Sequence, residues 1–96
     1  MFSQLHYLIR SRVDGQYLVA HPDEENQSGA GYLLIFSESF DARSYLNTHG
    51  SDVAEQFGVE SVSATQLKGV LQRWGFAGVG LVQEPLVPQI QFLSYS

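Results

Sequence analysis

The chain of 96 residues contains no cysteine. This absence excludes disulfides, thiolate metal sites, iron–sulfur clusters and cysteine nucleophiles. Because small secreted domains often depend on disulfides, it predicts a reducing compartment, and we expect a cytoplasmic protein. The first thirteen residues carry Arg10 and Arg12 within an apolar run and have no small-residue cleavage site, so they are not typical of a signal peptide.

Basic residues are also scarce. One Lys and four Arg stand against ten acidic residues, which gives a net charge of −5. Nucleic acids and anionic membranes attract proteins through Lys and Arg. We therefore expect neither nucleic acid nor a membrane surface as a partner. No apolar run approaches the roughly 20 residues that a transmembrane helix needs.

The remaining composition is that of a folded domain. Hydrophobic residues make up 44% of the chain and charged residues 16%. Disordered chains instead combine low hydrophobicity with high net charge. A chain of this length buries roughly 65% of its unfolded surface, which is enough for one core. We expect residues 1–96 to form a single domain.

An N-terminal β-hairpin is the most clearly signalled element. Side chains alternate in character over 4–13 and again over 16–21, and this period of two is typical of strands. The two runs flank Asp14-Gly15, a preferred two-residue hairpin loop in which both residues take positive φ. Such a loop would place Arg12 opposite Tyr17.

A buried strand and a helix are predicted next. The apolar run 32–36 favours a central strand that is covered on both faces. A helix over 40–49 would be capped by Ser37 or Ser39 and would end at Gly50. The polar segment 22–31, which precedes the strand, is expected to be a mobile loop.

The second predicted helix has signals at both ends. Ser63 and Gln66 form a capping box, and Gly75 supplies a left-handed cap. Its apolar stripe consists of Leu67, Val70, Leu71 and Trp74. Gly69 costs stability inside a helix and could mark the close approach of another backbone.

The other elements complete an α+β fold. We expect a helical turn over 51–58, a short strand over 59–62 and two last strands over 77–83 and 89–95. Glycines in the penultimate strand suggest that another backbone approaches closely. Pro85 and Pro88 favour an edge position for the last strand. The order β-β-β-α-β-α-β-β predicts a mixed sheet with some parallel pairing. Whether its two main amphipathic helices cover one face or both stays open.

Candidate binding residues lie on one face of the predicted hairpin. They form a cationic and aromatic stripe of Arg10, Arg12, His6, Tyr17 and His21. Two arginines can hold a carboxylate or a phosphate, and an arginine can stack on tyrosine. This pattern predicts a docking patch for an acidic partner or a small anion. The alternative is a solvent-facing strand whose arginine stems lie over apolar neighbours.

Other chemistries have weaker signals. Catalysis needs a nucleophile, a base and an orienting group, and no such pattern is present, so we expect no catalytic residue. His6 and His21 with Asp23 and Glu24 could hold zinc or iron, but the preferred interpretation is a solvated face beside an acidic loop. We expect no metal and no cofactor. The last strand could pair with a second copy and form a homo-oligomer.

Two resemblances follow from short motifs. The segment 34–38, a helix containing Ala42, the segment 75–81 and Pro85 together resemble the N-terminal domain of SseB-like proteins over about 32–85. That resemblance implies the fold and assigns no site residue. Glu84 stands where that family usually has Asn. The whole chain also resembles short proteins of photosynthetic bacteria, which share the Asp14-Gly15 hairpin and the segment 73–76. This resemblance implies a bacterial cytoplasm.

The sequence therefore predicts a binding protein. We expect a non-enzymatic interaction or regulatory module whose partner is a protein. The alternative is a small-anion or metal-binding protein, or an oligomeric enzyme, with its site near the N-terminal hairpin.

Overall fold

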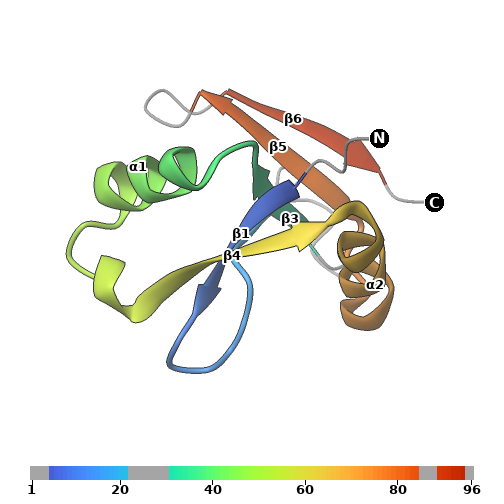
Figure 1. The fold of residues 1–96 in the computed structure, drawn as a ribbon, viewed down its shortest axis with the longest axis horizontal. Coiled ribbons are helices and arrows are strands. Elements are labelled where there is room, and N and C mark those ends of the chain that lie inside the picture. The colour runs from blue at the N-terminus through green and yellow to red at the C-terminus, as the bar shows by residue number, and fades with distance from the viewer. Residues whose placement is uncertain (1–4, 22–30, 85–88, 95–96) are drawn as a thin grey trace.

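A computed structural model describes residues 5–21, 31–84 and 89–94. The strands are β1 (Leu5–Ser11), β2 (Val19–Ala20), β3 (Tyr32–Phe36), β4 (Phe57–Ser63), β5 (Gly78–Glu84) and β6 (Gln89–Ser94). The helices are α1 (Ser39–His49) and α2 (Ala64–Trp74), and a 3₁₀ turn, η1, spans Ala54–Gln56. This order confirms the predicted α+β class and sequence of elements (Figure 1).

The six strands form one mixed sheet. Their order is β4-β1-β3-β5-β6, and β2 pairs with β3 beside this path. β3 and β5 are parallel, whereas the other pairs are antiparallel. A central, buried β3 and an edge position for the last strand are thereby confirmed. β4 is the terminal strand at the other end of the path.

The two main helices cover opposite faces of the sheet. In β1 and β3, neighbouring side chains point to opposite faces, as the strand period requires. One face packs Leu8, Leu33, Ile35 and Val62 with Val70 and Leu71 of α2. The other face packs Ile9, Leu34, Phe36 and Val82 with Ala42 and Leu46 of α1. Both faces of the central strands are therefore core.

Helix α2 has the predicted ends. The side chain of Ser63 accepts a hydrogen bond from the N–H of Gln66, and the Gln66 side chain accepts one from the N–H of Ser63. Gly75 adopts φ 72° and donates to the carbonyl of Leu71. The suggestion for Gly69 is wrong, because a Cβ added there meets nothing within 4 Å.

Helix α1 begins differently from the prediction. Its N-cap residue is Glu38, and no side chain caps the helix there, so the proposed caps Ser37 and Ser39 are wrong. Its end at Gly50 is confirmed by the bond from the Gly50 N–H to the carbonyl of Leu46. Packing against the sheet stabilises α1 in place of a side-chain cap.

The predicted hairpin is reduced to an isolated bridge, because β2 pairs with β3 and not with β1, and its predicted register is wrong. Tyr17 pairs with Arg10 and not with Arg12. Within this loop Gly15 has a positive φ and Asp14 does not, so Asp14 does not form the expected two-residue turn. The Asp14 carboxylate instead accepts a hydrogen bond from the N–H of Gln16, which lowers its pKa. Side-chain bonds of this kind close a longer loop, and the register shifts with loop length.

The start of β4 differs from the prediction, and the backbone contact at Gly78 agrees with it. β4 begins at Phe57, earlier than expected, because all seven of its residues pair with β1. A Cβ on Gly78 would overlap the backbone of Leu93, which confirms the predicted close approach. Residues 22–30 of the loop expected over 22–31, and the two prolines at 85 and 88, lie outside the described residues.

Candidate functional site: a two-arginine cavity

Arg10 is held by its neighbours in the fold. Its guanidinium carbon lies 4.9 Å from the centroid of the Tyr17 ring. Its Nε donates to the carbonyl of Gly15 at 2.7 Å, and Nη1 lies 3.6 Å from a carboxylate oxygen of Glu60. These three interactions join the hairpin to β4. They indicate a structural role for Arg10, because its charge is paired with Glu60 and its Nε–H is bonded to Gly15.

Tyr17 belongs to an aromatic cluster at the end of α2. Its ring centroid lies 5.1 Å from that of Trp74 and 6.5 Å from that of Phe76, edge to face in both cases. On the same side of β1, Leu8 is fully buried. Helix α2 therefore covers the part of this face around Leu8 and Tyr17, whereas Arg12 and His21 are exposed and the Arg10 side chain, which lies over the Tyr17 ring, is 38% exposed. The alternative of a solvent-facing strand with arginine stems over apolar neighbours stays a prediction.

The two histidines of the predicted stripe lie apart from the arginines. His6 pairs with Val62 of β4, and its buried Nδ1 has no hydrogen-bond partner among the described residues. His21 is exposed and follows the end of β2. Within residues 5–21, 31–84 and 89–94, no three potential metal ligands come together. Asp23 and Glu24 lie outside these ranges.

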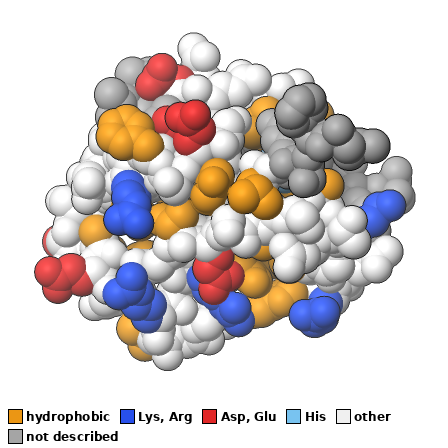
Figure 2. Space-filling model, in the orientation of Figure 1, with side chains coloured by type: hydrophobic (Ala, Val, Ile, Leu, Met, Phe, Trp, Pro, Cys, Tyr) orange, Lys and Arg blue, Asp and Glu red, His pale blue; other side chains and the backbone are white. Residues whose placement is uncertain are grey.

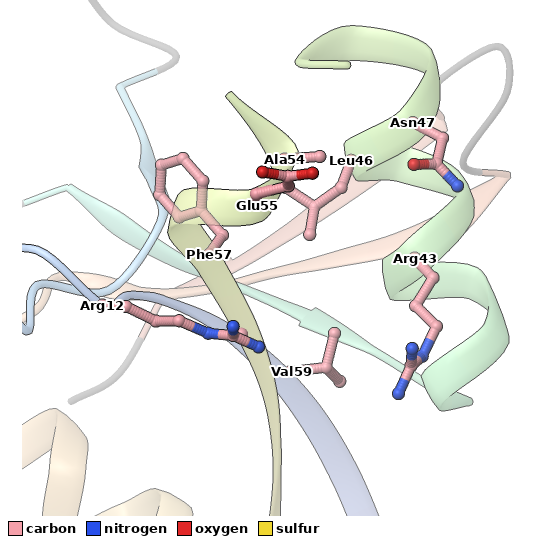
Figure 3. Close-up of a pocket in the computed structure, with 9 residues that line it drawn as sticks. Arg12, Arg43, Leu46, Asn47, Ala54, Glu55, Phe57 and Val59 are labelled. Atoms are coloured by element: carbon pink, nitrogen blue, oxygen red, sulfur yellow. The ribbon is translucent and has the colours of Figure 1, made fainter. Parts of the chain in front are cut away.

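Arg12 lines a cavity of about 510 Å³, which we call the arginine pocket (Figure 3). Helix α1 contributes Arg43, Leu46 and Asn47 to its lining. The turn η1 contributes Ala54 and Glu55, and β4 contributes Phe57, Gly58 and Val59. The pocket therefore joins the hairpin, the helix and the edge strand, which are distant in the sequence.

Local backbone contacts bring Arg12 to this place. Its N–H donates to the carbonyl of Gln56 at 2.7 Å, which continues the β1–β4 ladder beyond the end of β1. The side chain then passes Gly58, where an added Cβ would lie 3.2 Å from Nε. Arg43 and Asn47 are four residues apart and share one side of α1.

The pocket carries more positive than negative charge. Two guanidinium groups face it with one carboxylate, that of Glu55. In Figure 3 the guanidinium groups lie on either side of Val59, away from Glu55. In the described part of the chain, neither Arg12 nor Arg43 forms an ion pair. Two such groups can bind a carboxylate or a phosphate through charge-assisted hydrogen bonds.

A smaller cavity of about 210 Å³ adjoins the arginine pocket and shares Leu46 and Phe57 with it. Tyr45 and His49 also line it, with ring centroids 4.7 Å apart. Burial raises the pKa of Tyr45. The lining is chiefly apolar, so this space suits an apolar group next to the charged one.

No family model, curated protein or solved structure matches this chain. Both resemblances stated from the sequence therefore stay predictions. The fold and the site define an α+β protein with an open, cationic cavity beside an edge strand. No helix in the described ranges has the length and apolar character to cross a membrane.

Proposed function

We propose that this chain is a non-enzymatic binding module that recognises an anionic group of a protein partner in the arginine pocket. One observation carries the proposal. Arg12 and Arg43 come from different elements and line one cavity, and no acidic side chain among the described residues pairs with either. The chain has twice as many acidic as basic residues, yet among the described residues these two arginines have no acidic partner.

For a ligand in the pocket, the nearby charges of Arg12 and Arg43 outweigh the net negative charge of the chain. At physiological ionic strength the Debye length is about 8 Å, so remote carboxylates are largely screened from a ligand in the pocket. Leu46, Phe57 and Val59 form the apolar part of the lining, but the cavity is open to solvent, so the attraction for an anion depends on the two guanidinium groups. The chemistry therefore favours a carboxylate or a phosphate.

The distribution of basic residues supports a protein partner. On the face of the molecule that Figure 2 shows, Lys and Arg side chains are scattered singly between acidic and hydrophobic side chains. Nucleic acid and anionic membranes are instead bound by continuous basic surfaces. We place the module in the cytoplasm, which the absence of cysteine supports.

Titration with inorganic phosphate tests the pocket. The probe is added at constant ionic strength to the wild type and to the variants Arg12→Gln and Arg43→Gln, and binding is followed by calorimetry. Hydrogen bonds to charged groups contribute about 1.5–3 kcal/mol, so each variant should weaken binding roughly tenfold or more. Arg73→Gln is the matched control, because Arg73 is exposed on α2 outside the pocket.

The phosphate titration has one supporting result and two refuting results. Loss of affinity in the two pocket variants, with the control unchanged, supports the proposal. Equal phosphate affinity in the wild type and the double variant would refute it. Absence of phosphate binding by the wild type at millimolar concentration would also refute it.

A further inference from the structure

Strand β4 offers an open edge. It ends the strand order, and β1 pairs with one of its sides along its whole length. In the described ranges no strand pairs with its other side. Edge strands present unpaired N–H and C=O groups and can accept an additional strand.

The hydrogen bonds of β1 show which groups it directs towards β4. On the hairpin side, the carbonyl of Ile9 accepts from the N–H of Leu18, and the N–H of Ser11 donates to the carbonyl of Gln16. Peptide groups of successive residues point to opposite sides of a strand. The even-numbered residues of β1 therefore bond to β4.

The pairing of β4 with β1 also determines which peptide groups of β4 lie at its open edge. Gly58 pairs with Arg10, so its N–H and C=O point towards β1. The bond from the N–H of Arg12 to the carbonyl of Gln56 continues this pattern. The N–H and C=O groups of Val59 and Ser61 consequently point away from β1, at the open edge.

Val59 links this edge to the arginine pocket. Its side chain lines the pocket on the face of the sheet that α1 covers (Figure 3), and its peptide groups face the open edge. The Arg12 guanidinium lies beside Gly58, where an added Cβ would point towards it, so Arg12 approaches the pocket from the opposite face of β4. In an antiparallel pair, directly opposite Cβ atoms lie about 4.5–5.5 Å apart. A residue that pairs with Val59 from an added strand would therefore place its side chain at the pocket. The guanidinium groups that line the pocket favour an acidic side chain at that position.

We infer that the partner presents an extended acidic peptide, which adds to the edge of β4 with an Asp or Glu opposite Val59. This inference rests on the proposed function and specifies the form of the ligand. Main-chain hydrogen bonds to Val59 and Ser61 provide affinity, and the arginine pocket provides specificity, as in other cases of strand addition.

A second copy of this chain fits the edge less well. If β4 paired with β4 of another copy in antiparallel fashion, residues whose peptide groups point to the open edge would pair with each other. Only these residues could place a side chain at the pocket. These residues are Phe57, Val59, Ser61 and Ser63, none of which is acidic. Two chains of net charge −5 also repel each other.

The variant Ser61→Pro tests strand addition without disturbing the ladder to β1. Proline removes only the N–H that points outwards, a position at which edge strands tolerate it. Ser61→Ala, which keeps the N–H, is the matched control. The probe is a labelled, capped peptide of alternating Glu and Thr, as long as the seven residues of β4. Its binding is measured by fluorescence anisotropy.

The wild type and Ser61→Ala should bind this peptide, and Ser61→Pro should weaken the binding roughly tenfold through the lost hydrogen bond and strand fit. The amides of Val59 and Ser61 should exchange rapidly in the free protein and slowly with peptide bound. If Ser61→Pro does not fold, a peptide N-methylated at its Glu residues, whose N–H groups would point towards β4, gives the same test on the wild type. Its binding should be weakened to a similar extent.

The results that would overturn strand addition differ from those that would refute the proposed function. Equal binding of the N-methylated and unmodified peptides, with phosphate binding retained, overturns strand addition and leaves the pocket. Equal binding of a Lys–Thr peptide overturns selection by charge. No binding of the acidic peptide overturns the inference, and loss of phosphate binding as well overturns the proposed function. A dimer that Ser61→Pro dissociates would show that a second copy occupies the edge.

Discussion

Two glycines of α2 provide a sharp test of the energetics of the fold. Gly69 lies inside the helix, and a Cβ added there meets nothing within 4 Å. Glycine in a helix interior is about 1 kcal/mol less favourable than alanine. With no steric cost, Gly69→Ala should raise the free energy of unfolding by about 0.5–1 kcal/mol. For a domain of this size, Tm should increase by roughly 2–8 °C.

Gly75 is the matched position. A Cβ added there also meets nothing within 4 Å, but its φ is 72°. For L-residues, the left-handed conformation costs roughly 1–2 kcal/mol. Gly75→Ala should therefore lower the free energy of unfolding by about 1 kcal/mol. The two variants make the same chemical change and differ in backbone conformation, so their effects should have opposite signs.

Urea denaturation followed by circular dichroism measures both effects. The slope m should stay at its wild-type value, because neither change alters the surface exposed on unfolding. Phosphate affinity should also be unchanged, since α2 does not line the arginine pocket. Destabilisation by Gly69→Ala would refute the reasoning and would mean that another group occupies the space beside α2.

Three further outcomes are expected. Because burial raises the pKa of Tyr45 above its ordinary 10.0, the folded chain holds the phenol proton more tightly. The resulting stability is present below pH 10.0 and is lost as pH rises through the raised pKa, so Tyr45→Phe should flatten the alkaline part of a pH–stability curve. An unchanged curve would contradict this assignment. Gly78→Ala should displace the end of β6 and lower the free energy of unfolding by about 1–3 kcal/mol. Gly80→Ala should have a smaller effect, because side-chain ends that can move surround that position, and equal effects would argue against the backbone contact. If the chain self-associates through β6, Leu93→Ser should increase the monomer fraction in light scattering, because Leu93 is 46% exposed there. A wild type that is monomeric at every concentration would remove that expectation.

Elements with strong local signals could be predicted from the sequence. The capping box and Gly75 fix both ends of α2 through contacts within one or two turns. The continuous apolar run over 32–36 is explained by core packing on both faces of β3. Both signals depend on residues close together in the sequence, so no tertiary information was needed.

The hairpin register depended on contacts that the dipeptide Asp14-Gly15 does not encode. Ser11 accepts hydrogen bonds from the loop through its side chain and its carbonyl, and Asp14 binds the N–H of Gln16. The bond between Arg12 and Gln56 connects segments that are more than forty residues apart in the sequence. Local propensity favours a tight turn here, but side-chain and long-range bonds determine the loop.

The candidate site was only partly predictable for a related reason. Arg12 was among the predicted binding residues, whereas Arg43 and Asn47 read as ordinary polar positions of an amphipathic helix. Their role depends on α1 packing beside the start of β4, which no local pattern specifies. Arg10 has the same residue type as Arg12 and lies two positions away, yet Glu60 and Tyr17 engage it.

The central claim is that Arg12 and Arg43 receive the anion. The chain has four arginines, and their Nε–H groups can be observed separately by ¹H–¹⁵N NMR. On addition of inorganic phosphate at constant ionic strength, we expect the Nε signals of Arg12 and Arg43 to shift together and saturably. Those of Arg10, whose Nε is bonded to Gly15, and of Arg73 should stay in place. Equal shifts at all four arginines, or no shift at Arg12 and Arg43, would contradict the account.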